Sequence, residues 1–508
     1  MGKSGFVYLI GAGPGDPGLF TLKGKKILER ADVVVYDRLV SEKILALANA
    51  GAEMIYVGKI SGKHALPQDE INALLVEKAR EGKIVARLKG GDPFLYGRGG
   101  EEAQYIRENG LDYEVVPGIT SAIAVPAYAG IPVTHRDATS SFAVITGHER
   151  PDKGESTIKW EEISRGIGTL VFLMGVENLP FISSQLIKHG RDPGTPVALV
   201  RWGTTPRQEV LVGTLENIVE QVKIRSFKPP AVIIVGEVVN LRDELQWLEK
   251  KPLWGRKVVV TRSRAQASRL VDKIEELGGT AIEFPTIEIV REKDQSPLHK
   301  ALRSIEHYNW IIFTSANGVD IFFEELIATG RDIRDLKGIE ICAIGPATGR
   351  RLGEKGLQVS LIPEEYRAEG ILQELKKLIK PGHWILLPRA RGARAVLPDT
   401  VRQWGGHVNE VHIYEAVPAV KISRETLNLV LDGEVDYLTF TSSSTVKNFV
   451  NQVGREQVKG LRKKLKVACI GPVTADTARS MGFEVDVLAG LYTIDGLVDA
   501  IIEDVKKN

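Results

Sequence analysis

The chain has 508 residues, which is too long for one core and suggests roughly three to five domains at typical sizes of about 100–150 residues. Its hydrophobic content of 43% and charged content of 26% are ordinary for a globular protein. A net charge of +2, with Lys and Arg spread among Asp and Glu, argues against a nucleic-acid-binding face, and no apolar run approaches the ~18–20 residues that span a bilayer.

The first half alternates short apolar runs with helical periods. We predict strands over residues 6–10, 33–36 and 84–88, and helices over 19–30 and 68–81. This alternation is typical of an α/β architecture with mainly parallel sheets.

A strand-and-turn segment at 115–120 divides this first half into two lobes. Further strand-like runs follow it at 142–146, 170–174, 197–201 and 231–235. We therefore expect lobes of about 1–117 and 118–248. A linker over 249–255 follows, because a charged helix end is succeeded there by Pro252 and Gly255.

The second half, residues 256–508, repeats itself. Phe-Thr-Ser-Ala-Asn-Gly-Val at 313–319 returns as Phe-Thr-Ser-Ser-Ser-Thr-Val at 440–446, and Ile-Gly-Pro-Ala-Thr at 344–348 returns as Ile-Gly-Pro-Val-Thr at 470–474. Predicted strands lie at 258–262, 311–314, 341–344, 384–388, 438–441 and 467–470. The repeat indicates two paired α/β domains joined to an unrelated first module.

The two cysteines, Cys342 and Cys469, occupy near-equivalent places just before the two Gly-Pro pairs. Their apolar surroundings favour buried reduced thiols over a disulfide or a metal site. The N-terminus leads into the first strand without an apolar signal region. These features predict a cytoplasmic protein.

A glycine-rich loop follows the first strand directly, at residues 11–16. A loop of this kind lets a ligand approach backbone N–H groups closely. A dinucleotide-binding site is one interpretation, with Asp37 as the ribose-binding acid at the end of the next strand. Two residues disfavour it: Asp16 stands where the fingerprint needs Gly or Ala, and Pro14 removes a backbone donor. A nucleotide-dependent oxidoreductase is therefore the weaker alternative.

Seven motifs occur in order along residues 5–242, at 7–16, 36–40, 57–59, 87–94, 116–121, 130–136 and 174–175. In this combination the first half resembles the uroporphyrinogen-III C-methyltransferase family of tetrapyrrole methylases. The resemblance implies a two-lobed methylase fold that binds S-adenosylmethionine in the cleft between its lobes. It also implies a homodimer formed through this module.

The resemblance assigns cofactor binding to residues of both lobes, namely Pro14, Gly90, Gly91, Asp92, Leu95, Thr120, Ser121, Met174 and Gly203. Gly90 and Gly91 end a predicted strand and can present backbone groups to adenosine, while Asp92 can accept hydrogen bonds from the cofactor. Asp37 is implied as proton acceptor and Lys59 as proton donor. A carboxylate beside an electron-rich pyrrole stabilises the positive charge that develops there and then takes the proton.

A substrate with eight carboxylates needs cations in its site. Arg38, His135 and Arg136 lie in the matched motifs and are the predicted substrate-binding residues, and Lys63, His64 and Arg98 lie in or beside the same loops. No metal is expected.

The second half carries its own ordered motifs, at 259–262, 284–285, 313–319, 343–348, 386–389, 411–415, 440–444 and 470–474. With these it resembles uroporphyrinogen-III synthase across about 255–507. The resemblance implies two α/β domains joined by a two-strand ribbon, one from about 256–289 plus 417–508 and the other from about 290–416.

Hydroxyls and backbone donors after strand ends, without a Ser–His–Asp order, a metal spacing or a P-loop, suit a substrate that is already reactive. The resemblance implies Tyr414, Thr348 and Thr474 as catalytic residues, and Arg262, Ser315, Arg389 and Ser442 as holders of substrate carboxylates. The alternative for Tyr414 is a strand-end aromatic packed at a domain edge.

Both resemblances together imply a bifunctional enzyme. It would close hydroxymethylbilane with inversion of the last ring to give uroporphyrinogen III, and would methylate that product twice to precorrin-2 for siroheme or cobalamin synthesis. Two alternatives remain open: a methylase acting on a later corrin intermediate, and a second half that binds tetrapyrroles without catalysis.

Overall fold

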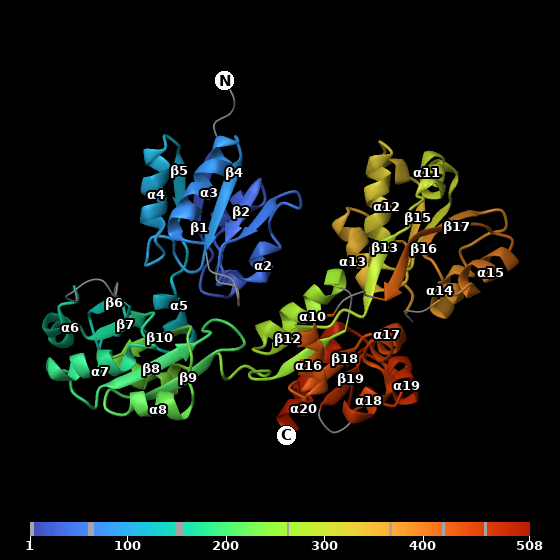
Figure 1. Ribbon diagram of the computed structural model, residues 1–508. Helices are drawn as coiled ribbons and strands as arrows, with labels where there is room; N and C mark the ends of the chain where they lie inside the picture. Colours follow the sequence, from blue (N-terminus) through green and yellow to red (C-terminus); the bar gives the residue numbers. More distant parts are fainter. Residues whose placement is uncertain are drawn as a thin grey trace. The chain divides into compact units, whose positions relative to one another are not determined.

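The computed structural model describes residues 5–58, 66–148, 157–261, 264–364, 368–418, 422–461 and 465–507. The chain forms two compact units. The first comprises the chain up to Arg256 together with Glu275–Thr280, and the second comprises Lys257–Ile274 and the chain from Ala281 onwards. The described residues form four five-stranded sheets, with helices packed around each (Figure 1).

The first lobe of unit 1 is built on a sheet of order β3-β2-β4-β1-β5 in which every pair of neighbours is parallel. Its strands are β1 Phe6–Gly11, β2 Val33–Tyr36, β3 Glu53–Tyr56, β4 Ile84–Lys89 and β5 Tyr113–Val116. Its helices are η1 Pro17–Leu19, α1 Leu22–Leu28, α2 Glu42–Leu45, α3 Gln68–Arg80 and α4 Gly99–Glu108. The helix predicted from residue 19 begins later, because Thr21 caps α1 by accepting a hydrogen bond from the Gly24 N–H.

The second lobe has a mixed sheet of order β6-β7-β10-β8-β9. Its strands are β6 Phe142–Thr146, β7 Thr169–Leu173, β8 Pro196–Arg201, β9 Glu209–Thr214 and β10 Ala231–Val235. Its helices are α5 Ser121–Tyr128, α6 Trp160–Gly166, α7 Leu179–Lys188, α8 Ile218–Ile224, η2 Glu237–Leu241 and α9 Arg242–Leu245.

The expectation of mainly parallel sheets is wrong for this lobe. Strand β10 runs antiparallel to β7 and β8, and β8 pairs antiparallel with β9. The short turn between Arg201 and Glu209 cannot hold a parallel crossover, which needs about a dozen residues or more. Apolar runs alone do not reveal strand direction.

In unit 2, one sheet has the order β12-β11-β18-β19-β20. Its strands are β11 Lys257–Val260, β12 Thr280–Glu283, β18 Tyr437–Phe440, β19 Lys466–Cys469 and β20 Val487–Leu488. The helices that belong to these segments of the chain are α10 Arg264–Glu276, α16 Arg424–Leu431, α17 Ser443–Val453, α18 Arg455–Leu461, α19 Pro472–Ser480 and α20 Ile494–Lys507.

The other sheet of unit 2 has the order β13-β17-β16-β14-β15 and uses one continuous stretch of chain. Its strands are β13 Ile287–Arg291, β14 Trp310–Phe313, β15 Glu340–Ala343, β16 Trp384–Ala390 and β17 His407–Pro418. Its helices are α11 Ser296–Arg303, η3 Ile305–His307, α12 Ala316–Ala328, η4 Ile333–Leu336, α13 Pro346–Glu354, α14 Ala368–Leu375 and α15 Val396–Gln403. Strands β13 and β17 pair antiparallel, so the chain enters and leaves this sheet side by side.

The sequence repeat corresponds to equivalent turns in the two sheets of unit 2. The Phe-Thr-Ser segments follow β14 and β18, and the Gly-Pro pairs open α13 and α19. Cys342 on β15 and Cys469 on β19 are both buried and unpaired, and burial raises the pKa of each thiol to about 12.

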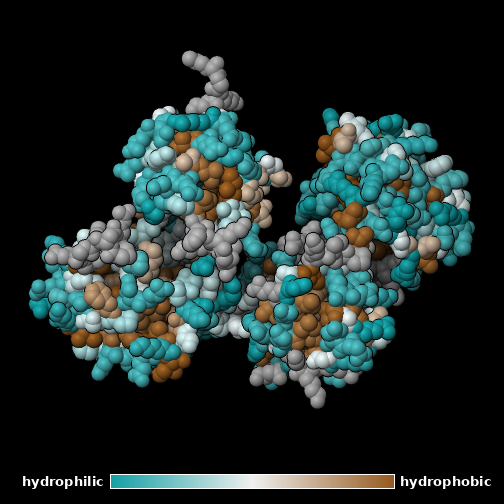
Figure 2. Space-filling model, in the orientation of Figure 1, coloured by the Kyte–Doolittle hydropathy of each residue, from teal (hydrophilic) through white to brown (hydrophobic). Residues whose placement is uncertain are grey.

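No helix within the described residues combines the length and apolarity that crossing a membrane requires. The visible surface in Figure 2 is largely hydrophilic, and its apolar atoms gather in separate patches.

Candidate active sites

A cavity of about 860 Å³ in unit 1 is lined by loops from both lobes. Most lining residues lie in segments that follow the strands β1, β2, β4, β5, β6, β7 and β8, while Pro229 and Pro230 precede β10. The carboxyl ends of strands are where open α/β sheets bind ligands. The cavity is therefore the candidate cofactor and substrate site of this unit.

Three glycines bring backbone segments unusually close together at this cavity. Gly13 and Gly91 exchange two backbone hydrogen bonds, with N–O distances of 3.2 and 2.7 Å, and both have positive φ angles of +78° and +69°. A Cβ atom added at Gly118 would lie 2.2 Å from the carbonyl oxygen of Gly91. The wall here is bare backbone, which fits a ligand held by N–H and C=O groups.

Every residue that the methylase resemblance assigns to the cofactor lines this one cavity: Pro14, Gly90, Gly91, Asp92, Leu95, Thr120, Ser121, Met174 and Gly203. Asp92 has a structural task as well. Its carboxylate oxygens accept hydrogen bonds from the backbone N–H groups of Phe94 (2.8 Å) and Gly118 (3.0 Å). It thus ties the glycine loop to the start of the next lobe, and only its remaining lone pairs are free for a ligand.

Strained backbone gathers around the cavity. Tyr96, Met174 and Trp202 line it with positive φ angles of 54°, 58° and 47°, and Thr204, between two lining residues, has a φ of 67°. Non-glycine residues rarely adopt such angles, and they concentrate at functional sites where the surrounding structure enforces them. Met174, which directly follows β7, is 54% exposed.

Sequence reasoning missed several lining residues, among them Tyr96, Trp202, Thr205 and Arg207. The guanidinium of Arg207 lies 4.7 Å from the ring centre of Trp202, which presents a cation at the mouth of the cavity. A signal for Trp202 did exist, because it directly follows the predicted strand 197–201. No comparable pattern in the sequence indicated Arg207.

Asp37 lies at the end of β2 and is partly exposed. Its Oδ1 accepts a hydrogen bond from the Leu39 N–H (3.0 Å), and its Oδ2 lies 3.9 Å from Nη1 of Arg87. Arg38, the next residue, lines the cavity. Lys59, the predicted proton donor, lies outside the described residues, as do Lys63 and His64.

Behind Asp37 is a buried cluster of charges. Oε1 of Glu102 accepts hydrogen bonds from Arg87 (3.2 Å), Lys89 (2.7 Å) and Gln68 (3.1 Å). Glu102 is 0% exposed, and burial lowers the pKa of Lys89. Arg87 and Lys89 lie on β4, which leads directly into Gly90 and Gly91, so this cluster supports both Asp37 and the glycine loop.

The other predicted substrate cations are less central. His135 and Arg136 are outside the lining of the cavity, and the His135 backbone forms a tight turn with Thr139. Arg98 pairs with Glu101 through two hydrogen bonds of 2.9 and 2.6 Å. Of the candidates that the structure describes, only Arg38 lines the cavity, where Arg207 and His148 are further positive or titratable neighbours.

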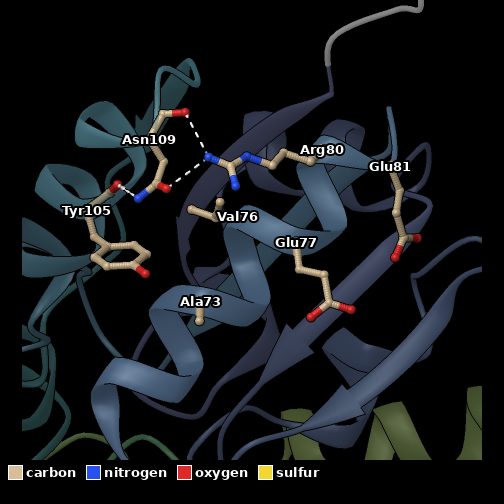
Figure 3. A pocket seen from close by; sticks show the side chains of 7 residues that line it. All are labelled: Ala73, Val76, Glu77, Arg80, Glu81, Tyr105 and Asn109. Atoms are coloured by element: carbon tan, nitrogen blue, oxygen red, sulfur yellow. Dashed lines mark hydrogen bonds between the residues drawn. The ribbon is translucent and has the colours of Figure 1, made fainter.

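A second, smaller depression of about 410 Å³ lies between α3 and α4, away from these loops (Figure 3). Its arginine, Arg80, already donates to the carbonyl oxygen and side chain of Asn109. Glu77 and Glu81 supply negative charge there. Such a surface is poorly suited to an octa-anionic substrate.

In unit 2, Tyr414 on β17 lies against the loop after β14. Its hydroxyl is 2.7 Å from Oγ of Ser315, and Ser315 in turn caps α12 by accepting a hydrogen bond from the Gly318 N–H (3.0 Å). Burial raises the pKa of Tyr414, which keeps its phenol protonated at neutral pH.

Arg389 on β16 belongs to the same sheet. Its side chain is 4% exposed, and it donates to Glu410 (3.2 Å) and to the carbonyl oxygen of Arg394 (2.9 Å). Burial lowers the pKa of Arg389, although Glu410 opposes the shift. Its Nε has no partner among the described atoms, so one donor remains unsatisfied.

The two turn threonines occupy equivalent places at the starts of helices. Thr348 lies in the first turn of α13 and Thr474 in the first turn of α19, and both are buried. Ser442 caps α17 through a hydrogen bond from the Thr445 N–H (3.3 Å). Thr348 thus lies beside the same sheet as Tyr414. Thr474 and Ser442 lie beside the other sheet of unit 2. Arg262 lies outside the described residues.

Across the described ranges, no three His, Cys, Asp or Glu side chains gather closely enough to hold a metal ion.

Both halves of the chain match known families. Residues 7–219 match Tetrapyrrole (Corrin/Porphyrin) Methylases, and residues 268–499 match Uroporphyrinogen-III synthase HemD. A relative from Ruminiclostridium josui, named Porphyrin biosynthesis protein HemD, is 39% identical over 501 residues, which cover 99% of this chain and 98% of that protein.

Other relatives align with the first half. An S-adenosyl-L-methionine-dependent uroporphyrinogen III methyltransferase from Methanosarcina barkeri is 54% identical over 244 residues, 48% of this chain and 96% of that protein. A solved structure of uroporphyrin-III C-methyl transferase from Thermus thermophilus with S-adenyl homocysteine is 43% identical, covers 47% of this chain and 100% of its own, and has a TM-score of 0.41. Since the full-length relative spans both matched regions, the chain belongs to the family in which a tetrapyrrole methylase is fused to a HemD-type uroporphyrinogen-III synthase.

Proposed function

We propose that unit 1 transfers methyl groups from S-adenosylmethionine to uroporphyrinogen III, giving precorrin-2 after two transfers, and that unit 2 makes uroporphyrinogen III from hydroxymethylbilane. The observation that carries the proposal is the 860 Å³ cavity of unit 1, which gathers predicted cofactor-binding residues from position 14 to position 203. The product of one reaction is the substrate of the other, which gives the fusion a chemical reason.

In unit 1, the bound cofactor supplies an electrophilic methyl group on a positively charged sulfur. The backbone of Gly13 and Gly91 would hold the adenosyl part, and bringing the pyrrole carbon close to the methyl group would supply much of the rate. Asp37, whose Oδ2 lies 3.9 Å from Nη1 of Arg87, stabilises the positive charge on the attacked ring and accepts its proton. Arg38 and Arg207 bind carboxylates of the substrate.

In unit 2, the phenol of Tyr414 assists departure of the substrate hydroxyl as a hydrogen-bond donor. Ser315 orients the phenol, and the buried cation of Arg389 draws a substrate carboxylate towards the same sheet. Thr348, Thr474 and Ser442 contribute hydroxyls for the remaining polar groups. A reactive hydroxymethylpyrrole needs little more acid help than this.

The test is one anaerobic experiment on the purified full chain given hydroxymethylbilane, with and without S-adenosylmethionine, and analysed by product mass and isomer. We expect uroporphyrinogen III without the cofactor and a product heavier by two methyl groups with it. Formation of the type I isomer alone would show that unit 2 is not a synthase. Formation of the type III isomer without methylation would assign unit 1 to another tetrapyrrole.

Replacing Asp37 should separate the two activities. Asp37→Asn keeps an oxygen for the Leu39 N–H but removes the charge, and we expect methylation to fall about 10²-fold or more while ring closure is unchanged. The measurement is the methylation rate on supplied uroporphyrinogen III. If only Asp37→Ala were impaired, Asp37 would serve the turn rather than the chemistry.

Replacing Tyr414 should act on the other half. Tyr414→Phe removes the hydroxyl that contacts Ser315, and we expect the enzymatic ring-closure rate to fall about 10–100-fold with methylation of supplied uroporphyrinogen III unaffected. Tyr308→Phe, which removes a hydroxyl bonded to Asn409 in the same sheet, is the matched control and should retain synthase activity. If Tyr414→Phe and Tyr308→Phe had equal ring-closure rates, Tyr414 would contribute only to packing.

We also propose that the chain works as a cytosolic homodimer joined through unit 1. Two unpaired buried thiols suit a reducing compartment, and exposed apolar side chains on unit 1, such as Leu22 (79%) and Phe181 (52%), offer surface for association. Light scattering on the full chain would give twice the 55.8 kDa monomer mass, whereas a monomer would overturn the proposal.

A further inference from the structure

Asp16, the residue that disfavours a dinucleotide fingerprint, belongs to a closed ring of hydrogen bonds. Its N–H donates to Oγ1 of Thr204 (3.1 Å), and the Thr204 N–H donates to Oε1 of Gln208 (3.1 Å). Nε2 of Gln208 donates to the carbonyl oxygen of Tyr128 (3.2 Å), whose hydroxyl donates to Oδ2 of Asp16 (2.7 Å). Each of the four residues both donates and accepts a hydrogen bond of the ring. Breaking one of these hydrogen bonds therefore affects the neighbouring ones.

The ring joins the two lobes of unit 1. Asp16 follows β1 of the first lobe, and its other oxygen accepts a hydrogen bond from the Gly18 N–H (2.7 Å), which fixes it in its own loop. Tyr128 ends α5, whose buried side chains Ala122 and Val125 pack with the second sheet. Thr204 and Gln208 lie between β8 and β9. Asp16 of the first lobe is thus bonded twice to the second lobe, through its carboxylate to Tyr128 and through its backbone N–H to Thr204, and Gln208 links these two residues.

The ring also holds a strained wall of the cavity. Trp202, Gly203 and Thr205 line the cavity around Thr204, which is a buried β-branched residue with a φ of 67°. Such a conformation persists only when neighbouring contacts over-determine it. Facing the turn is Gly15, where an added Cβ would lie 2.8 Å from Cγ2 of Thr205. The ring therefore holds the turn at residues 202–205 close to the glycine loop at the edge of the cavity.

The segment that leads out of the second lobe reinforces this ring from behind. The indole of Trp247 packs edge-on against Tyr128 with ring centres 5.1 Å apart, and its Nε1 donates to the carbonyl oxygen of Ala127 (3.0 Å). Arg242 donates to the carbonyl oxygen of Ala129 (3.0 Å) and binds Glu249 through two bonds of 2.6 and 2.8 Å. The whole C-terminal end of α5 is therefore fixed by residues 242–249.

We propose that Asp16, Tyr128, Gln208 and Thr204 are positioning residues that lock the turn at 202–205 against the glycine loop and thereby set the affinity of unit 1 for its cofactor. The inference rests on the proposed methyltransferase function. Residues 242–249 act as a buttress that keeps Tyr128 in place. Burial and the adjacent Asp16 carboxylate raise the pKa of Tyr128, so its hydroxyl remains a donor throughout the working pH range.

The test uses the full chain and S-adenosylhomocysteine as the calorimetric probe. Tyr128→Phe removes one hydroxyl, and we expect the dissociation constant to rise about tenfold, since the lost bond is to a charged group. The KM for uroporphyrinogen III and the synthase rate should change less than about twofold. Tyr8→Phe, which removes a hydroxyl bonded to Arg30 in the first lobe, is the matched control and should bind like the wild type.

A double-mutant cycle distinguishes the ring from general loosening. Asp16→Ala combined with Tyr128→Phe should bind the probe no more weakly than Asp16→Ala alone, because both changes open the same ring. Additive effects, or wild-type affinity in Tyr128→Phe, would overturn the proposal. Should Tyr128→Phe fail to fold, Thr204→Val carries the same test, since it keeps the branched shape and removes the acceptor for the Asp16 N–H. Wild-type affinity in that variant would equally overturn it.

The buttress has its own variant. Trp247→Ala leaves every ring residue in place, and we expect the dissociation constant of the probe to rise about threefold to fivefold through loss of the contact with Tyr128. If Trp247→Ala bound the probe with unchanged affinity, the positioning role would be limited to the four ring residues. Absence of probe binding by the wild-type chain is a different outcome: it would refute the proposed function itself, and the inference with it.

Discussion

Gly118→Ala is expected to abolish cofactor binding by unit 1. The added methyl group would lie 2.2 Å from the carbonyl oxygen of Gly91 and 2.6 Å from Cα of Gly11, distances at which a backbone segment must move. Movement would separate Gly91 from its hydrogen-bonded partner Gly13 and take the Gly118 N–H away from Asp92. We expect calorimetry to detect no S-adenosylhomocysteine binding and the methylation rate to fall at least ~100-fold, which corresponds to about 2.7 kcal/mol.

The chain offers an internal control and a matched one for this variant. Ring closure by unit 2 should continue at the wild-type rate, which would show that the effect of the substitution is confined to unit 1. Gly100→Ala adds a methyl group on α4 with no atom within 4 Å, so it should leave cofactor binding unchanged. Normal binding by Gly118→Ala would mean that the three-glycine contact is not part of the cofactor site.

Glu102→Ala is expected to have the largest effect on stability. Glu102 is fully buried and accepts hydrogen bonds from Arg87 and Lys89, so its removal leaves two buried cations facing each other. Breaking a buried ion pair in this way typically costs about 3–5 kcal/mol. Since β4 carries both cations and continues into Gly90, we expect methylation to be lost along with local stability.

Hydrogen exchange read by mass spectrometry would measure this loss segment by segment. Peptides from β4 and α4 should lose most of their protection in Glu102→Ala, whereas peptides from unit 2 should keep theirs. Glu101→Ala, a neighbouring but exposed position, is the control and should change protection by less than about 0.5 kcal/mol. Full protection in Glu102→Ala would mean that solvent or Asp37 compensates for the missing carboxylate.

The glycine motifs made part of the cavity wall in unit 1 predictable. Gly13, Gly91 and Gly118 occur where backbone segments approach closely or adopt positive φ angles. Glycine suits such positions best, so they can be recognised in the sequence. The resemblance to the methylases also named Met174 and Gly203 of the second lobe, and both line the same cavity. The role given to Asp92 was incomplete, since a motif does not reveal that both oxygens already bind backbone N–H groups.

The remaining parts depend on contacts between distant residues. Positive φ angles at Trp202 and Thr204 arise from tertiary hydrogen bonds, and no local pattern in the sequence marks them. The pairing of Arg87 with Glu102 reads in sequence as two ordinary surface charges. Strand direction in the second lobe was hidden for a similar reason, because apolar runs look alike in parallel and antiparallel sheets.

In the second half, the repeat correctly predicted equivalent strand–turn–helix elements, with each predicted strand within a residue or two of its observed bounds. The partnership of Tyr414 with Ser315 could not be read from the sequence, since the two lie 99 residues apart. The role of Tyr414 stays a prediction that Tyr414→Phe tests, and the roles of Thr348 and Thr474 stay predictions as well.

The split layout of unit 2 has a consequence for how the chain is made. Strand β11 pairs with β18, and the Lys257 N–H bonds the side chain of Asp436, 179 residues later. The sheet from β13 to β17 has all its strands within one intervening stretch. During synthesis that inserted sheet can close as soon as β17 has left the ribosome, while the outer sheet must wait for β18 and β19. Strand β11 can pair with β12 soon after synthesis, but its other edge stays unpaired until β18 is made, which leaves an apolar strand edge open to aggregation during translation.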